Sequence, residues 1–342
     1  MRIIFRADGN ATIGLGHVVR SLALAEIVRP VAACWFAIQN PSPAIRELLR
    51  QHRVTLWELP AQPIAEEAPY LAAQVQPTDI VVLDGYAFDT AYQRLLRHSG
   101  CRLVAIDDLR AWPSLAHLLI NHSPGVTPAM YQATPDTHFC LGPEYSLLRT
   151  PFLTHFHLPE APAPIRSVLL CFGGADPQQL TARFLAALLS LGSIREIGVI
   201  TGSAFPYTPR LAELAAQFPA TTVAFYQNVA APEMVQLLQR HDAVVCPAST
   251  ILIESLFLGK PVITGYYVAN QRHLADYVQQ RQQARSLGDF TAIAPDDLQP
   301  ALVQALTELE QVPRQPYVRQ PQPELLQAAF RRLQQLDPSG LA

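Results

Sequence analysis

The chain has 342 residues, a length that suggests about two domains. Hydrophobic residues make up 49% of it and charged residues 15%, so a large buried core is available. The formal net charge of -3, with no basic stripe, excludes the electrostatic footprint of a nucleic-acid-binding protein.

No apolar stretch approaches the roughly 18 residues needed to span a bilayer, and no basic-then-apolar leader precedes the first apolar run. The five cysteines are scattered and form no C-x-x-C pair, which argues against a disulfide framework and a thiolate zinc site. We therefore expect a cytoplasmic protein without stable membrane insertion.

Short β-rich apolar runs alternate with segments of helical period, the pattern of a parallel α/β sheet. In the first half, the runs predict a helix over 17–28 and strands at residues 2–6, 33–38, 80–84, 103–106 and 118–120. Three prolines within 155–166 restrict the backbone and predict an extended linker.

The same pattern then restarts. It predicts helices from about residues 177, 250 and 324, and strands at 167–172, 196–201, 222–226, 243–246 and 261–264. We expect an amino-terminal domain over 1–154, the linker, and a carboxyl-terminal domain over 167–325. A terminal helix and tail over 326–342 would follow. Ligands of such sheets bind at the carboxyl ends of the strands.

A glycine-containing loop follows the first predicted strand, and His17 opens the next helix. Gly14 and Gly16 allow a tight turn and a close approach of the backbone to a ligand. The third glycine of a dinucleotide fingerprint is Val19 here, so a nicotinamide cofactor is not expected. At the positive end of a helix dipole, a neutral His17 can accept a proton from water. The alternative is a surface histidine beside a helix cap.

Two further strand–helix turns predict anion sites. Gly173 and Gly174 free the backbone before a helix that Asp176 can cap, which leaves amides for an anion. Ser249 and Thr250 open another helix, where hydroxyls and amides can hold a pyrophosphate. Glu254, one turn further, can accept hydrogen bonds from ribose hydroxyls. The alternatives are an ordinary tight turn and an ordinary capped helix.

Acidic and aromatic residues collect at predicted strand ends of the first half: Asp84, Tyr86, Asp107 and Asp108. One of these aspartates can fix the tautomer of His17, and the sequence leaves open which one. The alternative is that they only form turns.

Taken together, these segments resemble one family, the UDP-2,4-diacetamido-2,4,6-trideoxy-β-L-altropyranose hydrolases of pseudaminic acid biosynthesis. The similarity is carried, in the family's order, by Phe5-Arg6-Ala7-Asp8, Ile13-Gly14-Leu15-Gly16-His17-Val18-Val19-Arg20, Asp84-Gly85-Tyr86, Ile106-Asp107-Asp108, Leu141-Gly142-Pro143-Glu144-Tyr145-Ser146-Leu147-Leu148-Arg149, Phe172-Gly173-Gly174-Ala175-Asp176, Ser249-Thr250 with Glu254, and Asn270-Gln271.

The resemblance implies a GT-B-like α/β fold, with two Rossmann-like domains whose parallel sheets face a central cleft. It implies that UDP binds the carboxyl-terminal domain and that His17 is the catalytic base. Water would attack the anomeric carbon, with C–O cleavage and no metal or cofactor. Tyr86 and Asn270 match positions near the sugar. The residues expected to bind substrate are Gly14, Gly16, Arg20, Asp84, Gly173, Gly174, Ser249, Thr250, Glu254 and Gln271.

One departure concerns the phosphate contacts. Many relatives carry a second glycine-rich turn where this chain has Pro247-Ala248-Ser249-Thr250, and Cβ atoms there limit the approach of backbone to phosphate. Two other functions stay open: an inverting glycosyltransferase, and a UDP-sugar-binding protein without catalysis. In each case the partner is a UDP-sugar, no nucleic acid is expected, and we expect a monomer.

Overall fold

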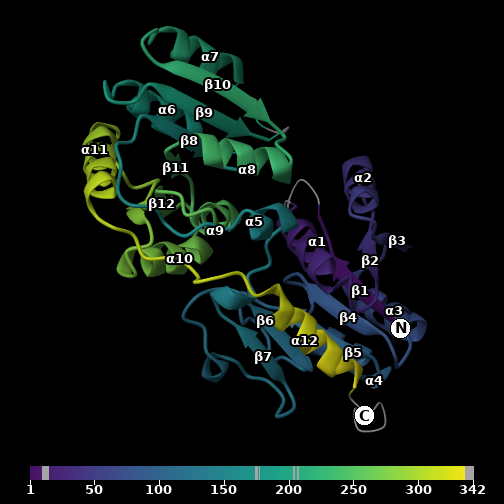
Figure 1. Cartoon of the computed structure of the whole chain (residues 1–342). Helices are drawn as coiled ribbons and strands as arrows, with labels where there is room; N and C mark the ends of the chain where they lie inside the picture. The colour runs from purple at the N-terminus through teal and green to yellow at the C-terminus, as the bar shows by residue number, and fades with distance from the viewer. Residues whose placement is uncertain (10–14, 174–175, 177, 203–204, 206–207, 336–342) are drawn as a thin grey trace. The chain divides into compact units, whose positions relative to one another are not determined.

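The computed structural model describes residues 1–9, 15–173, 176, 178–202, 205 and 208–335. The chain forms two compact units (Figure 1). Unit 1 contains Met1–Thr150 and the chain from Pro321 onward, and unit 2 contains Pro151–Gln320.

Unit 1 is built on a seven-stranded parallel sheet in the order β3-β2-β1-β4-β5-β6-β7. Its central strands are apolar and almost wholly buried, as expected where helices cover both faces of a parallel sheet. The strands are β1 (Arg2–Ala7), β2 (Ala33–Gln39), β3 (Thr55–Leu59), β4 (Ile80–Asp84), β5 (Arg102–Ile106), β6 (Leu118–Asn121) and β7 (His138–Leu141).

Unit 2 repeats this plan with a six-stranded parallel sheet in the order β10-β9-β8-β11-β12-β13. Relative to its own first strand, each sheet reads 3-2-1-4-5-6, which is the Rossmann order. The strands are β8 (Ser167–Cys171), β9 (Glu196–Thr201), β10 (Thr222–Gln227), β11 (Ala243–Val245), β12 (Val262–Tyr266) and β13 (Arg285–Asp289).

The helices that connect the strands follow local sequence signals. In α2, Ser42 caps the first turn by accepting a hydrogen bond from the Ile45 amide, and in α4 Asp89 does the same for Tyr92. The helices of unit 1 are α1 (Gly16–Val28), α2 (Pro43–Gln51), α3 (Ile64–Gln74), α4 (Thr90–His98) and α12 (Pro323–Gln334), with short 3-10 turns at η1 (Pro128–Met130) and η2 (Pro143–Tyr145).

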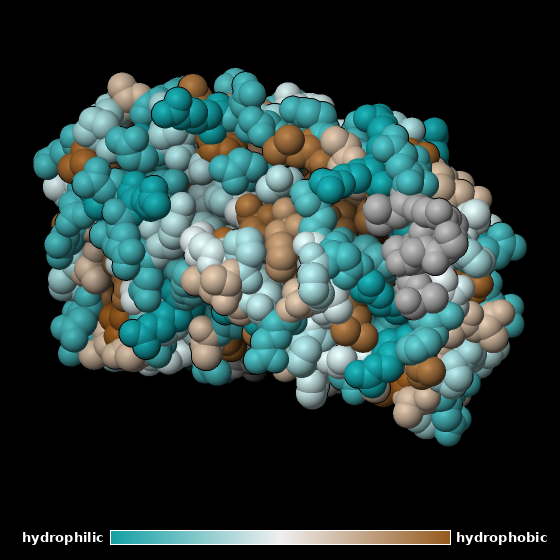
Figure 2. Space-filling model, turned by 90° about the horizontal axis from the view of Figure 1, so that it is seen from below, coloured by the Kyte–Doolittle hydropathy of each residue, from teal (hydrophilic) through white to brown (hydrophobic). Residues whose placement is uncertain are grey.

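Those of unit 2 are α6 (Leu180–Leu189), α7 (Thr208–Ala216), α8 (Ala231–Arg240), α9 (Thr250–Phe257), α10 (Ala269–Gln280) and α11 (Pro295–Gln311). The short helix α5 (Thr150–Thr154) begins at the boundary between the units. All five cysteines lie in the described part of the chain, where they are buried and form no disulfide. On the face in Figure 2, hydrophobic residues appear in small groups among hydrophilic ones.

The structure differs from the sequence prediction at the carboxyl terminus. The prediction placed the last helix in a tail beyond the second domain, whereas α12 belongs to unit 1 and packs beside α1 (Figure 1). Gln327 donates to the carbonyl of Ile27, and the guanidinium of Arg102 donates to the carbonyl of Leu333. A buried apolar stripe that includes Phe330 holds the helix in place.

We expect Phe330→Ala to lower the free energy of unfolding by about 3–5 kcal/mol, because a wholly buried phenyl ring would leave a cavity. Arg331 is exposed on the same helix, so Arg331→Ala is the matched control and should change stability by less than about 0.5 kcal/mol. Urea unfolding of both variants measures the difference. Equal stability of the two variants would contradict the packing of α12 on unit 1.

Candidate functional site

In unit 1, the predicted site residues meet at the point where the strand order reverses. β1 pairs with β2 on one side and with β4 on the other, so the chains leaving β1 and β4 diverge there. Ligands of doubly wound sheets bind in this crevice. His17 lies in the first turn of the helix that follows β1, and Asp84 is the last residue of β4.

Asp84 holds the cluster together. Its side chain is wholly buried, and Oδ1 lies 2.7 Å from Nδ1 of His17 and 2.5 Å from Nη2 of Arg20. Oδ2 accepts hydrogen bonds from Nε of Arg20 at 3.0 Å and from the hydroxyl of Ser21 at 3.1 Å. Both carboxylate oxygens are thus engaged by residues of one helix. Although Asp84 was predicted to contact the substrate, this geometry makes it the residue that positions His17.

The contact with Asp84 also fixes the tautomer of His17. An ionised carboxylate has no proton to donate, so the hydrogen between the two groups belongs to Nδ1. The guanidinium of Arg20, 3.3 Å from the same Nδ1, then acts as a neighbouring charge rather than as a donor to it. Nε2 of the neutral ring keeps its lone pair and is the atom that can accept a proton.

A second carboxylate also binds Arg20. Nη1 of Arg20 donates to Oδ2 of Asp108 at 2.9 Å, so one guanidinium joins Asp84 and Asp108. Burial alone would raise the pKa of Asp84, but the charge of Arg20 and hydrogen bonds from His17 and Arg20 lower it below its usual value. Burial opposes the charge of Arg20, yet the two carboxylates raise its pKa. Asp84 and Arg20 are therefore both ionised at neutral pH.

Tyr86 packs against the imidazole from the loop after β4. The two rings meet edge to face, with centroids 4.7 Å apart at 84°. Tyr86 is 48% exposed, and its carbonyl accepts a hydrogen bond from the indole of Trp112. Burial of the phenol and the negative charge of Asp108 raise the pKa of Tyr86, so the hydroxyl stays protonated and can donate.

Of the two glycines predicted to bind substrate in the first loop, the structure describes Gly16. Gly14 lies outside the described residues. Gly16 is the first residue of α1, and a Cβ added there would have no protein atom within 4 Å. Among the described residues, packing therefore does not require glycine at this position. The predicted contact of Gly16 with a ligand stays a prediction.

In unit 2, the predicted residues also follow the carboxyl ends of adjacent strands. β8, β11 and β12 are neighbours in parallel register, with Leu170 beside Val245 and Val245 beside Ile263. Gly173 follows β8, Ser249 and Thr250 follow β11, and Asn270 and Gln271 follow β12. The structure thus brings these five residues to one edge of the sheet, and Gly173, Ser249 and Thr250 follow the two strands, β8 and β11, at which the strand order reverses.

The turn after β8 differs from the prediction. The helix begins at Leu180 rather than near residue 177, and Asp176 caps it by accepting hydrogen bonds from the Leu180 and Thr181 amides at 2.9 and 2.7 Å. A protein carboxylate therefore takes the place expected for a bound anion at this helix start. Gly173 has a φ of +89°, a conformation that favours glycine, and Gly174 lies outside the described residues.

The turn after β11 keeps its polar groups available. Ser249 occupies the cap position of α9, but its side chain makes no capping hydrogen bond. Ser249 is half-buried and Thr250 is exposed, so both hydroxyls can meet a ligand. Glu254 lies one turn further and is 2% exposed. Its contact with a ribose stays a prediction.

At the start of α10, Asn270 is exposed. The side-chain oxygen of Gln271 accepts a hydrogen bond from the Tyr267 amide at 3.2 Å and so holds the preceding loop. Sequence reasoning missed Ser21, which lies one helical turn after His17, and gave no role to Trp112.

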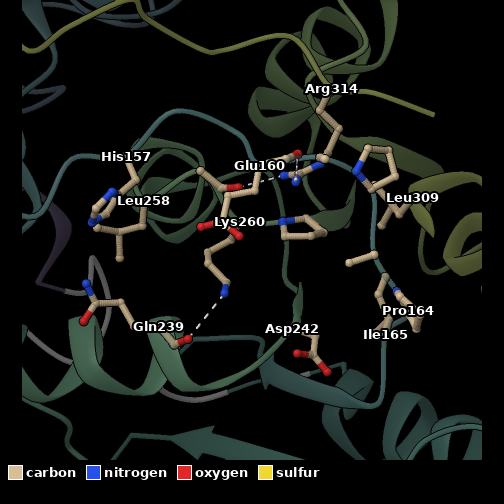
Figure 3. A pocket seen from close by; sticks show the side chains of 15 residues that line it. His157, Glu160, Pro164, Ile165, Gln239, Asp242, Leu258, Lys260, Leu309 and Arg314 are labelled. Carbon is tan, nitrogen blue, oxygen red and sulfur yellow. Dashed lines mark hydrogen bonds between the residues drawn. The ribbon is translucent and has the colours of Figure 1, made fainter. Parts of the chain in front are cut away.

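A separate cavity of about 340 Å³ lies in unit 2 near the amino ends of its strands (Figure 3). The guanidinium of Arg314 donates there to the carbonyls of Gly259 and Glu160 and so joins three segments of the chain. The formal charges of Lys260, Arg314, Glu160 and Asp242 cancel. These contacts explain Arg314 as a structural residue.

Three findings concern ligand and membrane chemistry. Among the described residues, no helix is long and apolar enough to cross a membrane. In the same part of the chain, no group of three or more His, Cys, Asp or Glu side chains is arranged to hold a metal ion. No protein-family model matches the chain.

Several known proteins are similar in sequence. The chain is 24% identical over 290 residues to an uncharacterized protein of Methanocaldococcus jannaschii, an alignment that covers 81% of this chain and 58% of that protein. It is 22% identical to the spore coat polysaccharide biosynthesis protein SpsG of Bacillus subtilis, covering 87% and 86%. It is 21% identical to the UDP-2,4-diacetamido-2,4,6-trideoxy-β-L-altropyranose hydrolase of Campylobacter jejuni, covering 82% and 97%.

Solved structures share the fold. MurG of Acinetobacter baumannii superposes with a TM-score of 0.65 at 14% identity, covering 98% of this chain and all of MurG. The UDP-GlcNAc 2-epimerase of Neisseria meningitidis, solved with UDP-GlcNAc, gives 0.59 at 10% identity, covering 97% and 99%.

The pH dependence of stability tests the ionised network. We expect Asp84→Asn to lower the free energy of unfolding by about 3–5 kcal/mol at neutral pH, because it removes the buried partner of an ion pair and leaves the guanidinium of Arg20 with the partly exposed Asp108 as its carboxylate partner. The pKa of Asp84 is lowered in the fold, so the stabilisation is fully present above the ordinary value of 3.8 and is lost as the pH falls through the lowered pKa.

Urea unfolding of wild type and Asp84→Asn between pH 7 and pH 2 measures this difference. Asp108→Asn is the comparison variant, because Asp108 is 29% exposed and binds Arg20 through one oxygen. A difference between wild type and Asp84→Asn that did not change with pH would contradict the ionised network.

With two parallel-sheet α/β units and these relatives, the chain has the fold of the GT-B glycosyltransferases and related epimerases, and it is a distant homologue of the diacetamido-trideoxy-altropyranose hydrolase.

Proposed function

We propose that this protein hydrolyses a UDP-linked sugar to the free sugar and UDP, with His17 as the general base. The observation that carries the proposal is the 2.7 Å contact between the wholly buried carboxylate of Asp84 and Nδ1 of His17, at the reversal of strand order. A histidine oriented in this way can take a proton from water, and the carboxylate behind it stabilises the imidazolium that forms.

The reaction breaks one bond and forms another at the anomeric carbon. The water oxygen attacks that carbon as Nε2 of His17 removes a proton, and the bond from carbon to the UDP oxygen breaks with its electron pair leaving on UDP. The configuration at carbon is inverted. Tyr86, whose hydroxyl remains protonated, donates a hydrogen bond to the sugar.

The residues of unit 2 are assigned to the nucleotide. Hydroxyls of Ser249 and Thr250 and the amides that open α9 hold the diphosphate, and they stabilise its charge as it leaves. Glu254 binds the ribose, and Asn270 with Gln271 borders the sugar. The contribution of Gly173 is the backbone conformation of its turn, because Asp176 fills the helix start beyond it.

The similarity to the Campylobacter hydrolase supports a 2,4-diacetamido-2,4,6-trideoxy sugar as the substrate. The similarity to SpsG supports a role in polysaccharide biosynthesis without indicating a particular sugar. Because MurG and other neighbours share the fold, a glycosyltransferase is the second candidate. In that case His17 would deprotonate an acceptor hydroxyl instead of water.

We expect His17→Asn to reduce turnover about 10²–10⁴-fold, the usual contribution of a general base, while UDP affinity stays near that of wild type. His98 is an exposed histidine on α4, so His98→Asn is the matched control and should retain full activity. Turnover is measured as UDP release, and affinity by calorimetry. Unchanged turnover in His17→Asn would remove His17 from the mechanism.

Isotope labelling separates the three reaction classes. In water enriched in oxygen-18, we expect the label on the free sugar and none on UDP, because water attacks carbon. A label on phosphate would indicate a pyrophosphatase. UDP release that depends on an added acceptor would indicate a glycosyltransferase.

A further inference from the structure

A small slot lies beside Tyr86 in unit 1, between the loop after β4 and the loop after β5. Its volume is about 30 Å³, room for two or three water-sized groups. Its apolar lining comes from buried side chains of β4, β5 and the segment between β4 and α4, namely Leu83, Phe88, Ala105 and Ile106.

Three exposed apolar side chains border the slot. Tyr86 and Trp112 are each 48% exposed, and Leu109 is 41% exposed. These residues are held in place, since the indole of Trp112 donates to the carbonyl of Tyr86 at 3.3 Å. Apolar groups kept exposed beside a cavity are typical of a ligand-binding surface.

The loop that carries Leu109 and Trp112 has a defined shape. Oδ1 of Asp107 accepts hydrogen bonds from the amides of Leu109 and Arg110 at 3.0 and 2.7 Å, which closes a turn. The carbonyl of Asp107 accepts a further bond from the hydroxyl of Tyr131 at 2.9 Å. The slot therefore has a shape that does not depend on a bound molecule.

Most polar groups of the lining are already engaged. Gln93 donates to the carbonyl of Phe88 and accepts from the Leu115 amide, and the hydroxyl of Ser114 also donates to Gln93. Asp108 is the exception: Oδ2 binds Arg20, but Oδ1 is buried without a hydrogen-bond partner in the described structure. A buried carboxylate oxygen without a donor is costly.

The slot thus offers an apolar space of a few atoms, and one of its lining residues, Asp108, carries an acceptor that lacks a donor in the described structure. An acylamino group matches both, because its methyl group is apolar and its amide N–H is a donor. A hydroxyl group would supply the donor and leave the apolar space unfilled.

We propose that this slot recognises an acylamino substituent of the sugar, with Leu109, Trp112 and Asp108 as specificity-determining residues. The proposal rests on the proposed function and deepens it. It ties the selection of N-acylated sugars to particular residues of unit 1, separately from the catalysis by His17.

The test compares three substrates: a UDP-linked diacetamido-trideoxy sugar and two analogues, in each of which one of the two acetamido groups is replaced by hydroxyl. We expect wild type to favour the diacetamido substrate over the analogue of one position by about 10–200-fold in kcat/KM, the usual value of a methyl-sized group in a fitted pocket. Trp112→Ala and Leu109→Ala should reduce this preference about tenfold and leave kcat/KM for that analogue within about twofold.

Leu95 is 42% exposed on α4 and does not line the slot, so Leu95→Ala is the matched control for Leu109→Ala and should keep the wild-type preference. Thermal melting confirms that each variant is folded. Equal losses on the diacetamido substrate and its analogues, or a preference unchanged in both variants, would overturn the slot as the determinant while leaving hydrolysis intact.

A binding measurement keeps the two proposals distinguishable. If wild type releases no UDP from any of the three compounds, the proposed hydrolysis fails. Saturation-transfer NMR with the same compounds then tests the slot alone. We expect the strongest transfer at an acetyl methyl group, and its loss in Trp112→Ala and Leu109→Ala. Transfer spread evenly over the sugar would overturn the proposal.

Discussion

The candidate site depends on one buried carboxylate. Asp84 receives hydrogen bonds from Arg20 and Ser21 and orients His17, so three residues of one helix are fixed against the end of one strand. Burying an unpaired carboxylate would be prohibitive, and the guanidinium of Arg20 supplies the compensating charge. Because Arg20 also binds Asp108, the same guanidinium connects the group around His17 to the loop after β5.

The fold was predictable from the sequence where strands are buried and therefore consist of apolar residues. The strands at the centre of each sheet, such as β1, β4 and β8, are unbroken apolar runs, and the sequence predicted them within a residue or two. The three strands it missed, β3, β7 and β13, are all at sheet edges. An edge strand packs against fewer neighbours and therefore carries polar residues, as in Arg285–Asp289, which hide the signal.

Contacts between residues far apart in the sequence limited how much of the candidate site could be predicted. The sequence indicated His17 from its place in a glycine loop and left open which aspartate supports it, since Asp84 is 67 residues away. Only the parallel pairing of β1 with β4 brings them together. At the turn after β8, the sequence predicted a helix from about residue 177, but the helix begins at Leu180. Asp176 therefore accepts hydrogen bonds from the Leu180 and Thr181 amides.

The repetition of one strand order in both units places different side chains after equivalent strands. In unit 1 the crevice between β1 and β4 carries a histidine, acids and aromatic rings, groups suited to proton transfer and to the apolar parts of a sugar. In unit 2 the equivalent crevice between β8 and β11 carries serine and threonine hydroxyls at a helix start, groups suited to a diphosphate. The same strand order thus carries different side chains in the two units, because the residues after the strands differ. This difference is why we assign the sugar to unit 1 and the nucleotide to unit 2 in the proposed function.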